Sequence, residues 1–237
     1  MFVLLTCAAL LTASSPSAQS PPAPPSGGQE RVNLVRTYEE GKVNTYQLNL
    51  VLSGEGAEMA VSADIVMKVE KKLSGGAAQM AVSVSNFTMV RDGVEMSPEE
   101  VEQFSAKFDK HGLPVPASIA GVESAEFFYL TVFAGYVPAK EVKVGETNSF
   151  TWDDESGTRI EGTSKFEGIE TIDGVKAAKL TVHLDISPES GEPGTLDFTS
   201  YVEIQSGKLL KADGRLDVPG EASGTVSVKL KKPPTDG

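Results

Sequence analysis

The sequence predicts a mainly β protein, built as a single curled antiparallel sheet, a half-open barrel of about nine or ten strands, with one or two helices covering its concave face. Three observations predict this fold. Apolar and polar residues alternate in long runs, short glycine-rich turns separate the runs, and helical spacing is confined to residues 97–135. Alternation with a period of two is typical of strands with one dry and one wet face. A sheet of this width must curl or split, and splitting would give a sandwich instead.

The clearest alternation lies between Thr45 and Arg91. Every second residue is apolar from Tyr46 to Leu52, and again from Met59 to Val69 after a Gly-rich turn. A third run follows the turn at residues 74–76, and its pattern shifts by one position near Ser85-Asn86. One extra residue at that point predicts a β-bulge. We therefore expect a meander of three long strands with an apolar inner face.

A helical insert is predicted at residues 97–135. Ser97-Pro98-Glu99-Glu100 has the hydroxyl, proline and glutamate of a helix N-terminus with a capping box. Three apolar residues follow at helical spacing: Val101, Phe104 and Phe108. A second helix is predicted from Ala125 to Ala134, although residues 128–133 would also suit a buried strand. We expect the helical segment to dock on the sheet, because its apolar face needs a dry partner.

Strand patterns return at Val142 and continue to Leu230. Asp173-Gly174 is a strong signal for a two-residue hairpin turn. The alternation has the same form on both sides of the insert, so residues 31–232 are predicted to be one β-rich domain. Residues 233–237 form a polar tail without a pattern.

The first residues are predicted to be a targeting segment. An apolar run from Phe2 to Ala13, followed by small residues, indicates a signal peptide over residues 1–18, and the run is too short to span a bilayer. Residues 19–30, rich in Pro and Gly, are predicted to be a disordered tether. Cys7 lies inside the apolar run, which favours a soluble over a lipid-anchored form. We expect an exported bacterial protein, periplasmic or secreted, with no transmembrane span after cleavage and no disulfide framework.

Charge excludes one large class of partner. The formal net charge is −12, with 33 acidic residues against 21 Lys and Arg. Nucleic-acid binding needs clustered basic residues, so we expect no nucleic-acid partner. A broad attraction to anionic lipid headgroups is disfavoured for the same reason.

No catalytic or metal-binding motif stands out. The two histidines, His111 and His183, have no supporting Ser, Cys or zinc-site motif, and we interpret them as surface or helix-capping residues. The acidic run at residues 153–157 lacks the spacing of a calcium loop and fits a solvated turn. We therefore expect a protein that is not an enzyme and that needs no metal or cofactor.

Methionines and aromatic residues suggest a binding site. We expect an apolar cavity between sheet and helices, because flexible Met and aromatic side chains can line an adaptable pocket. Its predicted lining comprises Met59, Met67, Met80, Phe104, Phe108, Phe128 and Phe133. The alternative is that these side chains fill the space completely, as in a normally packed core.

The order of the elements resembles that of the LolA/LolB-like and LppX/LprG-like exported bacterial proteins. Two turn sequences, Val142-Lys143-Val144-Gly145-Glu146 and Gln205-Ser206-Gly207-Lys208-Leu209-Leu210, are similar to turns in exported proteins of this type. The resemblance implies an unclosed barrel whose concave side is covered by short helices and holds acyl chains. It carries no functional residue over to this sequence.

Two functions are expected from these observations. The first is a non-catalytic carrier or sensor of an apolar ligand, such as a lipid or acyl chain, in the bacterial envelope. The alternative is an envelope module with a packed core and no ligand, which meets another protein through an edge strand or a loop.

Overall fold

The computed structural model describes residues 30–54, 56–96, 103–119, 125–154 and 157–232, and for residues 125–128 the backbone alone. The predicted signal peptide, nearly all of the predicted tether, the predicted tail and the predicted capping box at Ser97 lie outside the described residues.

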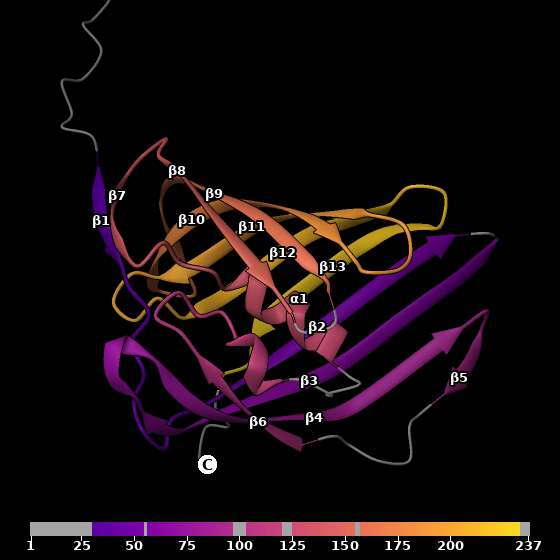
Figure 1. Ribbon diagram of the computed structural model, residues 1–237, viewed down its shortest axis with the longest axis horizontal. Helices are drawn as coiled ribbons and strands as arrows, with labels where there is room; N and C mark the ends of the chain where they lie inside the picture. The colour runs from indigo at the N-terminus through magenta and orange to yellow at the C-terminus, as the bar shows by residue number, and fades with distance from the viewer. Residues whose placement is uncertain (1–29, 55, 97–102, 120–124, 155–156, 233–237) are drawn as a thin grey trace, which may run out of the picture.

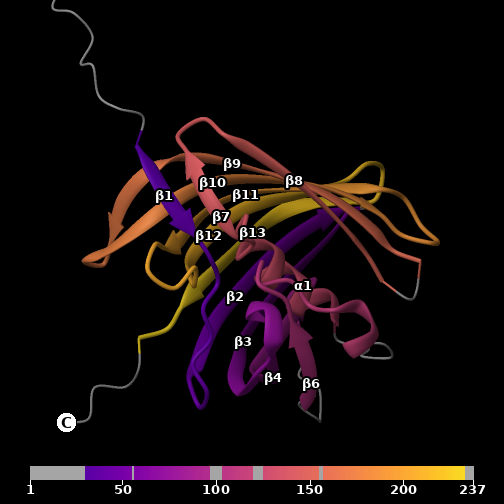
Figure 2. The same ribbon diagram turned by 60° about the vertical axis from the view of Figure 1, so that its left-hand side comes forward.

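One antiparallel sheet of 11 strands dominates the molecule. Its order is β5-β4-β3-β2-β13-β12-β11-β10-β9-β8, with β6 pairing a second part of β4. The strands are β2 (Val43–Gly54), β3 (Ala57–Lys72), β4 (Ala78–Arg91), β5 (Val94–Met96), β6 (Gln103–Phe108), β8 (Thr147–Asp153), β9 (Arg159–Ile172), β10 (Val175–Ser187), β11 (Gly194–Glu203), β12 (Leu209–Val218) and β13 (Ala222–Leu230). The sheet arches without closing into a barrel, which confirms the predicted fold class (Figures 1 and 2).

The register follows the alternation in the sequence. Val61, Ala63 and Ile65 of β3 are buried on the inner face, as are alternate residues of β10 on the other side of the sheet. The predicted bulge is also confirmed, because the pairing of β3 with β4 shifts beside Asn86, whose φ is +50°. Asparagine tolerates this left-handed conformation better than most residues.

A small second sheet of two strands stands apart from the large one. β1 (Arg31–Leu34) pairs antiparallel with β7 (Lys140–Lys143) and does not join the large sheet. Leu34 and Val142 are buried by this pairing. The described strands therefore exceed the predicted nine or ten, because the large sheet is wider than expected and two short strands stand apart from it.

The predicted first helix is wrong where the structure describes it. Residues 103–108 form strand β6, which pairs with β4 from Ala78 to Ser83. Phe104 and Phe108 are four residues apart, a spacing that fits both a helix face and a strand face. Ala106 between them is buried on the same side, and the edge of β4 supplies backbone partners, so the strand forms.

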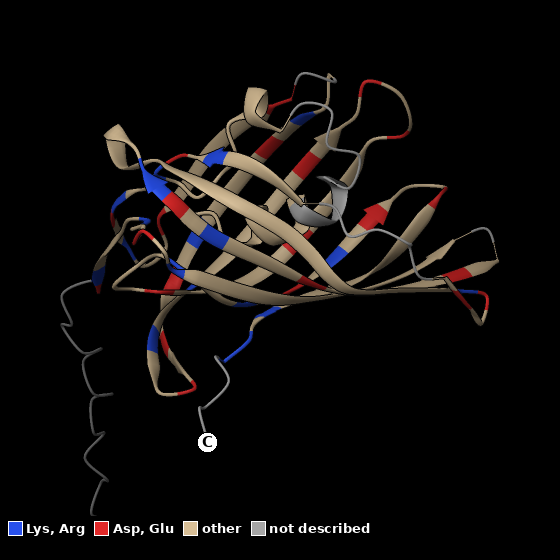
Figure 3. Cartoon of the chain, turned by 90° about the horizontal axis from the view of Figure 1, so that it is seen from below, with Lys and Arg blue, Asp and Glu red and all other residues tan. Residues whose placement is uncertain are grey.

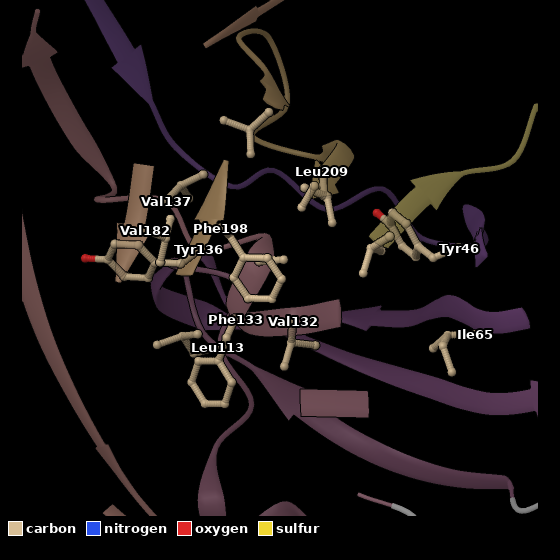
Figure 4. Close-up of a cluster of buried hydrophobic side chains, with 14 of the residues drawn as sticks. Tyr46, Ile65, Leu113, Val132, Phe133, Tyr136, Val137, Val182, Phe198 and Leu209 are labelled. Carbon is tan, nitrogen blue, oxygen red and sulfur yellow. The ribbon is translucent and has the colours of Figure 1, made fainter. Parts of the chain in front are cut away.

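The predicted second helix is confirmed as α1 (Ala125–Ala134), whereas the alternative of a buried strand is not. The helix lies under the arch of the sheet and contacts β2, β11 and β13 (Figures 1 and 2). Val132 and Phe133 lie among side chains of the sheet in Figure 4 and are buried. Among the described residues, no helix is long and apolar enough to cross a membrane.

The short segments on either side of α1 complete the inner layer. The chain from Asp109 to Val115 and the 3-10 turn η2 (Pro116–Ser118) precede it, and the chain from Gly135 to Ala139 follows it. The other 3-10 turn, η1 (Ser74–Gly76), lies outside this layer and joins β3 to β4. Leu113 and Val137 are buried beside α1 (Figure 4). One half of the concave face is therefore filled by the described residues of 109–119 and 129–137.

A glycine lets β8 close over this inner layer. Phe150 of β8 is the direct partner of Gly162 in β9, and its ring occupies the space where a side chain at Gly162 would stand. The Phe150 ring stacks on Tyr136, with centroids 4.0 Å apart, and faces Phe133 at 6.4 Å. The absent side chain thus positions an aromatic cluster that ties β8 to the end of α1.

Gly162→Ala is expected to destabilise the protein, because its added methyl group would overlap the Phe150 ring. Overpacking of this kind costs about 1–3 kcal/mol. Gly135→Ala is the matched control, since its added methyl group would meet neighbours only at ordinary contact distances of 3.5 Å or more. Urea unfolding of both variants measures the difference, and equal unfolding free energies would contradict the packing argument.

Candidate functional site

An apolar pocket of about 490 Å³ lies at one end of the concave face. It is bounded by α1, by β2 and β3 on one side, and by the ends of β9 to β12 on the other. The side chains that define it are mostly aliphatic or aromatic and come from inward-facing positions: Leu52, Met59, Tyr129, Leu130, Ile186 and Leu216. Each is only partly buried while packing against the core. The pocket thus continues the dry inner face beyond the part that the described residues cover.

Polar groups are confined to the rim of the pocket. Glu192 lies in the loop between β10 and β11, and Glu221 lies in the turn between β12 and β13; both are exposed. Thr158 and Ser190 are further polar neighbours. Because both charged residues of the lining are acidic, the rim repels negative charge more than it repels a neutral or cationic group.

The residues predicted to line a cavity separate into two groups. Met59 and Phe133 line the pocket. Met67, Met80 and Phe108 are at most 2% exposed and belong to the packed half of the core. Two further residues complete the set: Phe104 is half-buried on β6, and the side chain of Phe128 lies outside the description. The segments 109–119 and 134–137 separate the groups, because they fill the half of the concave face that the buried methionines occupy.

The predicted cavity lining does not include the aliphatic residues at the hairpin ends. Ile186 is the last apolar residue in the alternating run of β10, and Leu216 lies near the end of β12. Each continues the inward phase of its strand beyond the part that α1 covers. The alternation in the sequence already marks both residues as inward-facing. It does not show where α1 stops covering the sheet, because that depends on the tertiary structure.

Trp152 of β8 packs against two residues that line the pocket. Its indole Nε1 donates a buried hydrogen bond of 2.7 Å to the Pro114 carbonyl. Its ring packs edge-on against Tyr129, at 5.2 Å between centroids, and against Phe133, at 5.4 Å. Trp152 therefore connects β8, the segment before α1 and α1 itself, and it touches two residues of the pocket lining.

Both histidines lie away from this pocket. His111 Nδ1 is 3.0 Å from the Val137 carbonyl, and its ring stacks on Tyr136. On β10, His183 is 2.7 Å from Asp197 Oδ1 and 3.3 Å from Asp185 Oδ1. The hydrogen bond to Asp197, together with the charge of both carboxylates, raises the pKa of His183 against a smaller opposing effect of burial.

The acidic run at residues 153–157 is described in part. Asp154 Oδ1 accepts a 2.8 Å hydrogen bond from the Thr158 backbone N–H, as a turn residue does, while residues 155–156 lie outside the description. Within the described ranges, no three His, Cys, Asp or Glu residues gather as a potential metal site.

Comparison with known proteins gives fold-level matches at low similarity. No family model and no curated protein matches the chain. A Bacteroides fragilis protein with a YmcC-like fold, inferred to be exported, aligns with 84% of this chain and 100% of its own, at 12% identity and a TM-score of 0.34. A DUF1329 family protein from Desulfovibrio piger aligns with 83% of this chain and 88% of its own, at 11% identity and a TM-score of 0.25. Neither is described as LolA/LolB-like or LppX/LprG-like.

His183→Gln is expected to remove a pH-dependent contribution to stability. A folded-state pKa above the unfolded value means that protonated His183 stabilises the fold at pH values below about 6.5, the usual histidine pKa, and that this stabilisation is lost as pH rises through the folded pKa. The His183 side chain is 42% exposed, so solvent screening limits the effect to about 1 kcal/mol or less. The test is to measure the unfolding free energies of the wild type and His183→Gln at pH values from below 6.5 to well above it. A difference that grows toward alkaline pH would contradict the assignment.

Proposed function

We propose that the protein is an exported, non-catalytic carrier or sensor of an apolar ligand, such as a lipid or acyl chain, in the bacterial envelope. The observation that carries the proposal is the partly open apolar pocket of about 490 Å³ beside α1. Its size lies in the range typical of small-molecule sites, roughly 300–1,000 Å³. The signal-peptide pattern of residues 1–18 supports export.

Burial of methylene groups would supply the affinity. Each buried CH₂ contributes about 0.8 kcal/mol, so a chain of roughly ten methylenes would gain about 8 kcal/mol before the cost of ordering the ligand. The acidic rim formed by Glu192 and Glu221 would leave a neutral or cationic head in water. We therefore propose an uncharged or cationic amphiphile in preference to a free fatty acid.

A second function is favoured by one observation at the edge of the sheet. Val94 and Met96 of the short edge strand β5 are 63% and 41% exposed. An exposed apolar edge strand can add a strand from a partner protein. In this alternative the protein would bind an envelope protein, and the pocket would remain without a ligand.

The first experiment asks whether a ligand is present and which headgroup is accepted. Protein purified from its native host is extracted with organic solvent for mass spectrometry, and a fluorescent fatty acid is compared with its uncharged methyl ester in binding titrations. We expect a stoichiometric amphiphile and tighter binding of the ester. An extract without any bound amphiphile, combined with no uptake of either probe, would leave the edge-strand alternative.

The second experiment fills the pocket. Ile186→Trp places a larger side chain in the lining, and we expect at least a tenfold rise in the ester's Kd, or about 1.4 kcal/mol. Ile204→Trp is the matched control, because Ile204 packs against the same core but outside the pocket. Equal affinities of the two folded variants would exclude this pocket as the binding site.

A further inference from the structure

A second, chemically different pocket of about 400 Å³ lies near the opposite ends of the same strands. It is bounded by the β9–β10 turn, the β11–β12 turn and the last residues of β13. Five of its 12 lining residues are lysines: Lys208, Lys211, Lys229, Lys231 and Lys232. Two acids, Asp173 and Glu203, also line it. A local excess of positive charge in a chain of net charge −12 sets this place apart.

The basic pocket belongs to a charge separation along the sheet. In Figure 3, Lys and Arg are concentrated toward the left of the view, whereas the right-hand part carries mostly Asp and Glu. The apolar pocket, with Glu192 and Glu221 at its rim, lies toward the acidic hairpins. The two pockets therefore have opposite electrostatic preferences.

Register places two of the lysines directly opposite each other. Lys211 of β12 pairs with Lys229 of β13, and both point to the outer face, because their neighbours Ala212 and Val228 are buried on the inner face. Like charges that face each other across two strands destabilise a sheet. Lys229 has no ion-pair partner among the described residues within 4.0 Å, while Lys211 is 3.4 Å from Asp213. An anion bound by both side chains would offset this repulsion.

The lysines of this pocket differ in the contacts that their ammonium groups make. Lys211 Nζ lies 4.9 Å from the centroid of the Tyr201 ring of β11, a cation–π contact. Lys231 Nζ is 2.8 Å from Asp64 Oδ2, and Asp64 is buried, so Lys231 is engaged in a structural pair. Lys232, by contrast, is 3.7 Å from Asp173 in an exposed pair that contributes little stability. Lys211 and Lys229, which the register places opposite each other on β12 and β13, are therefore the pair of lysines that a single anion could contact together.

We propose that this basic pocket binds an anionic phosphate group, with Lys211 and Lys229 as its principal contacts. A phosphate monoester carries about −1.5 to −2 charges near neutral pH, so it matches two neighbouring lysine side chains better than a carboxylate with one charge does. Ile172, Val175 and Leu210 of the lining offer apolar contact to an organic group attached to the phosphate. The same chemistry is found in a free phosphate compound and in a phospholipid headgroup at a membrane surface.

Footprinting of lysines in the unmodified protein tests the proposal without any mutation. The protein is treated with an amine-acetylating reagent, and modification of each lysine is followed by mass spectrometry in inorganic phosphate, in acetate at equal ionic strength, and with two kinds of vesicle. The vesicles are phosphatidylcholine alone and phosphatidylcholine containing phosphatidic acid. Lys68, an exposed lysine of β3 outside the pocket, is the internal reference.

Each outcome of the footprinting decides for or against the site. Slower modification of Lys211 and Lys229, relative to Lys68, in phosphate supports the proposal with a free phosphate compound as the ligand. The same protection only by phosphatidic acid vesicles supports it with a lipid headgroup as the source. Equal protection by acetate, or no selective protection in any condition, overturns it.

A pair of matched double variants gives an independent measurement. Lys211→Gln with Lys229→Gln removes the facing charges, whereas Lys68→Gln with Lys107→Gln removes the same net charge from lysines outside the pocket. We expect the first pair of substitutions to weaken binding of whichever phosphate source protects the wild type at least tenfold, with the control pair near the wild-type value. Without phosphate, the first variant should also melt at a higher temperature than the control, because the repulsion is gone. Equal loss of binding in both would show a net-charge effect and overturn the site.

Discussion

The large apolar inner face of the sheet determines both where the core is packed and where the apolar pocket lies. Eleven strands that alternate apolar and polar residues create a wide concave surface, and water must be excluded from it. Among the described residues, one helix of 10 residues and the segments 109–119 and 135–137 cover only one half. In that half Phe108 and Tyr136 are packed and buried. In the other half the same inward-facing pattern runs on beyond the cover that the described residues give, and the apolar pocket lies there.

Much of this architecture is contained in local sequence patterns. Alternation fixed which side chains of β3 and β10 face inward, the Asp173-Gly174 turn fixed a hairpin, and the slip at Asn86 located a bulge. The segment 103–108 was predicted as a helix, because two phenylalanines four residues apart satisfy both periods. What decides between them is whether a neighbouring edge offers hydrogen bonds, and β4 does so from Ala78 to Ser83. Such a tertiary condition cannot be read from the segment itself.

The two candidate sites differ in how far the sequence could predict them. An apolar lining was expected from the methionines and aromatics, yet Met67 and Met80 lie in the packed half, while Ile186 and Leu216 line the pocket. All four side chains are apolar and face inward, and only their position relative to α1 distinguishes the buried pair from the pair that lines the pocket. The basic pocket depends on register: Lys211 and Lys229 are 18 positions apart in the chain and become neighbours only when β12 pairs with β13. The overall charge of −12 concealed this local reversal of sign.

The separate β1–β7 sheet has a mechanical consequence for how the N-terminal segment transmits force. Only four pairs join β1 to β7, and β1 is not hydrogen-bonded to any strand of the large sheet in the part of the chain that the structure describes. Tension applied from the N-terminal side would therefore act first on these four pairs and on the burial of Val32 and Leu34, before it reached the hydrogen bonds of the large sheet.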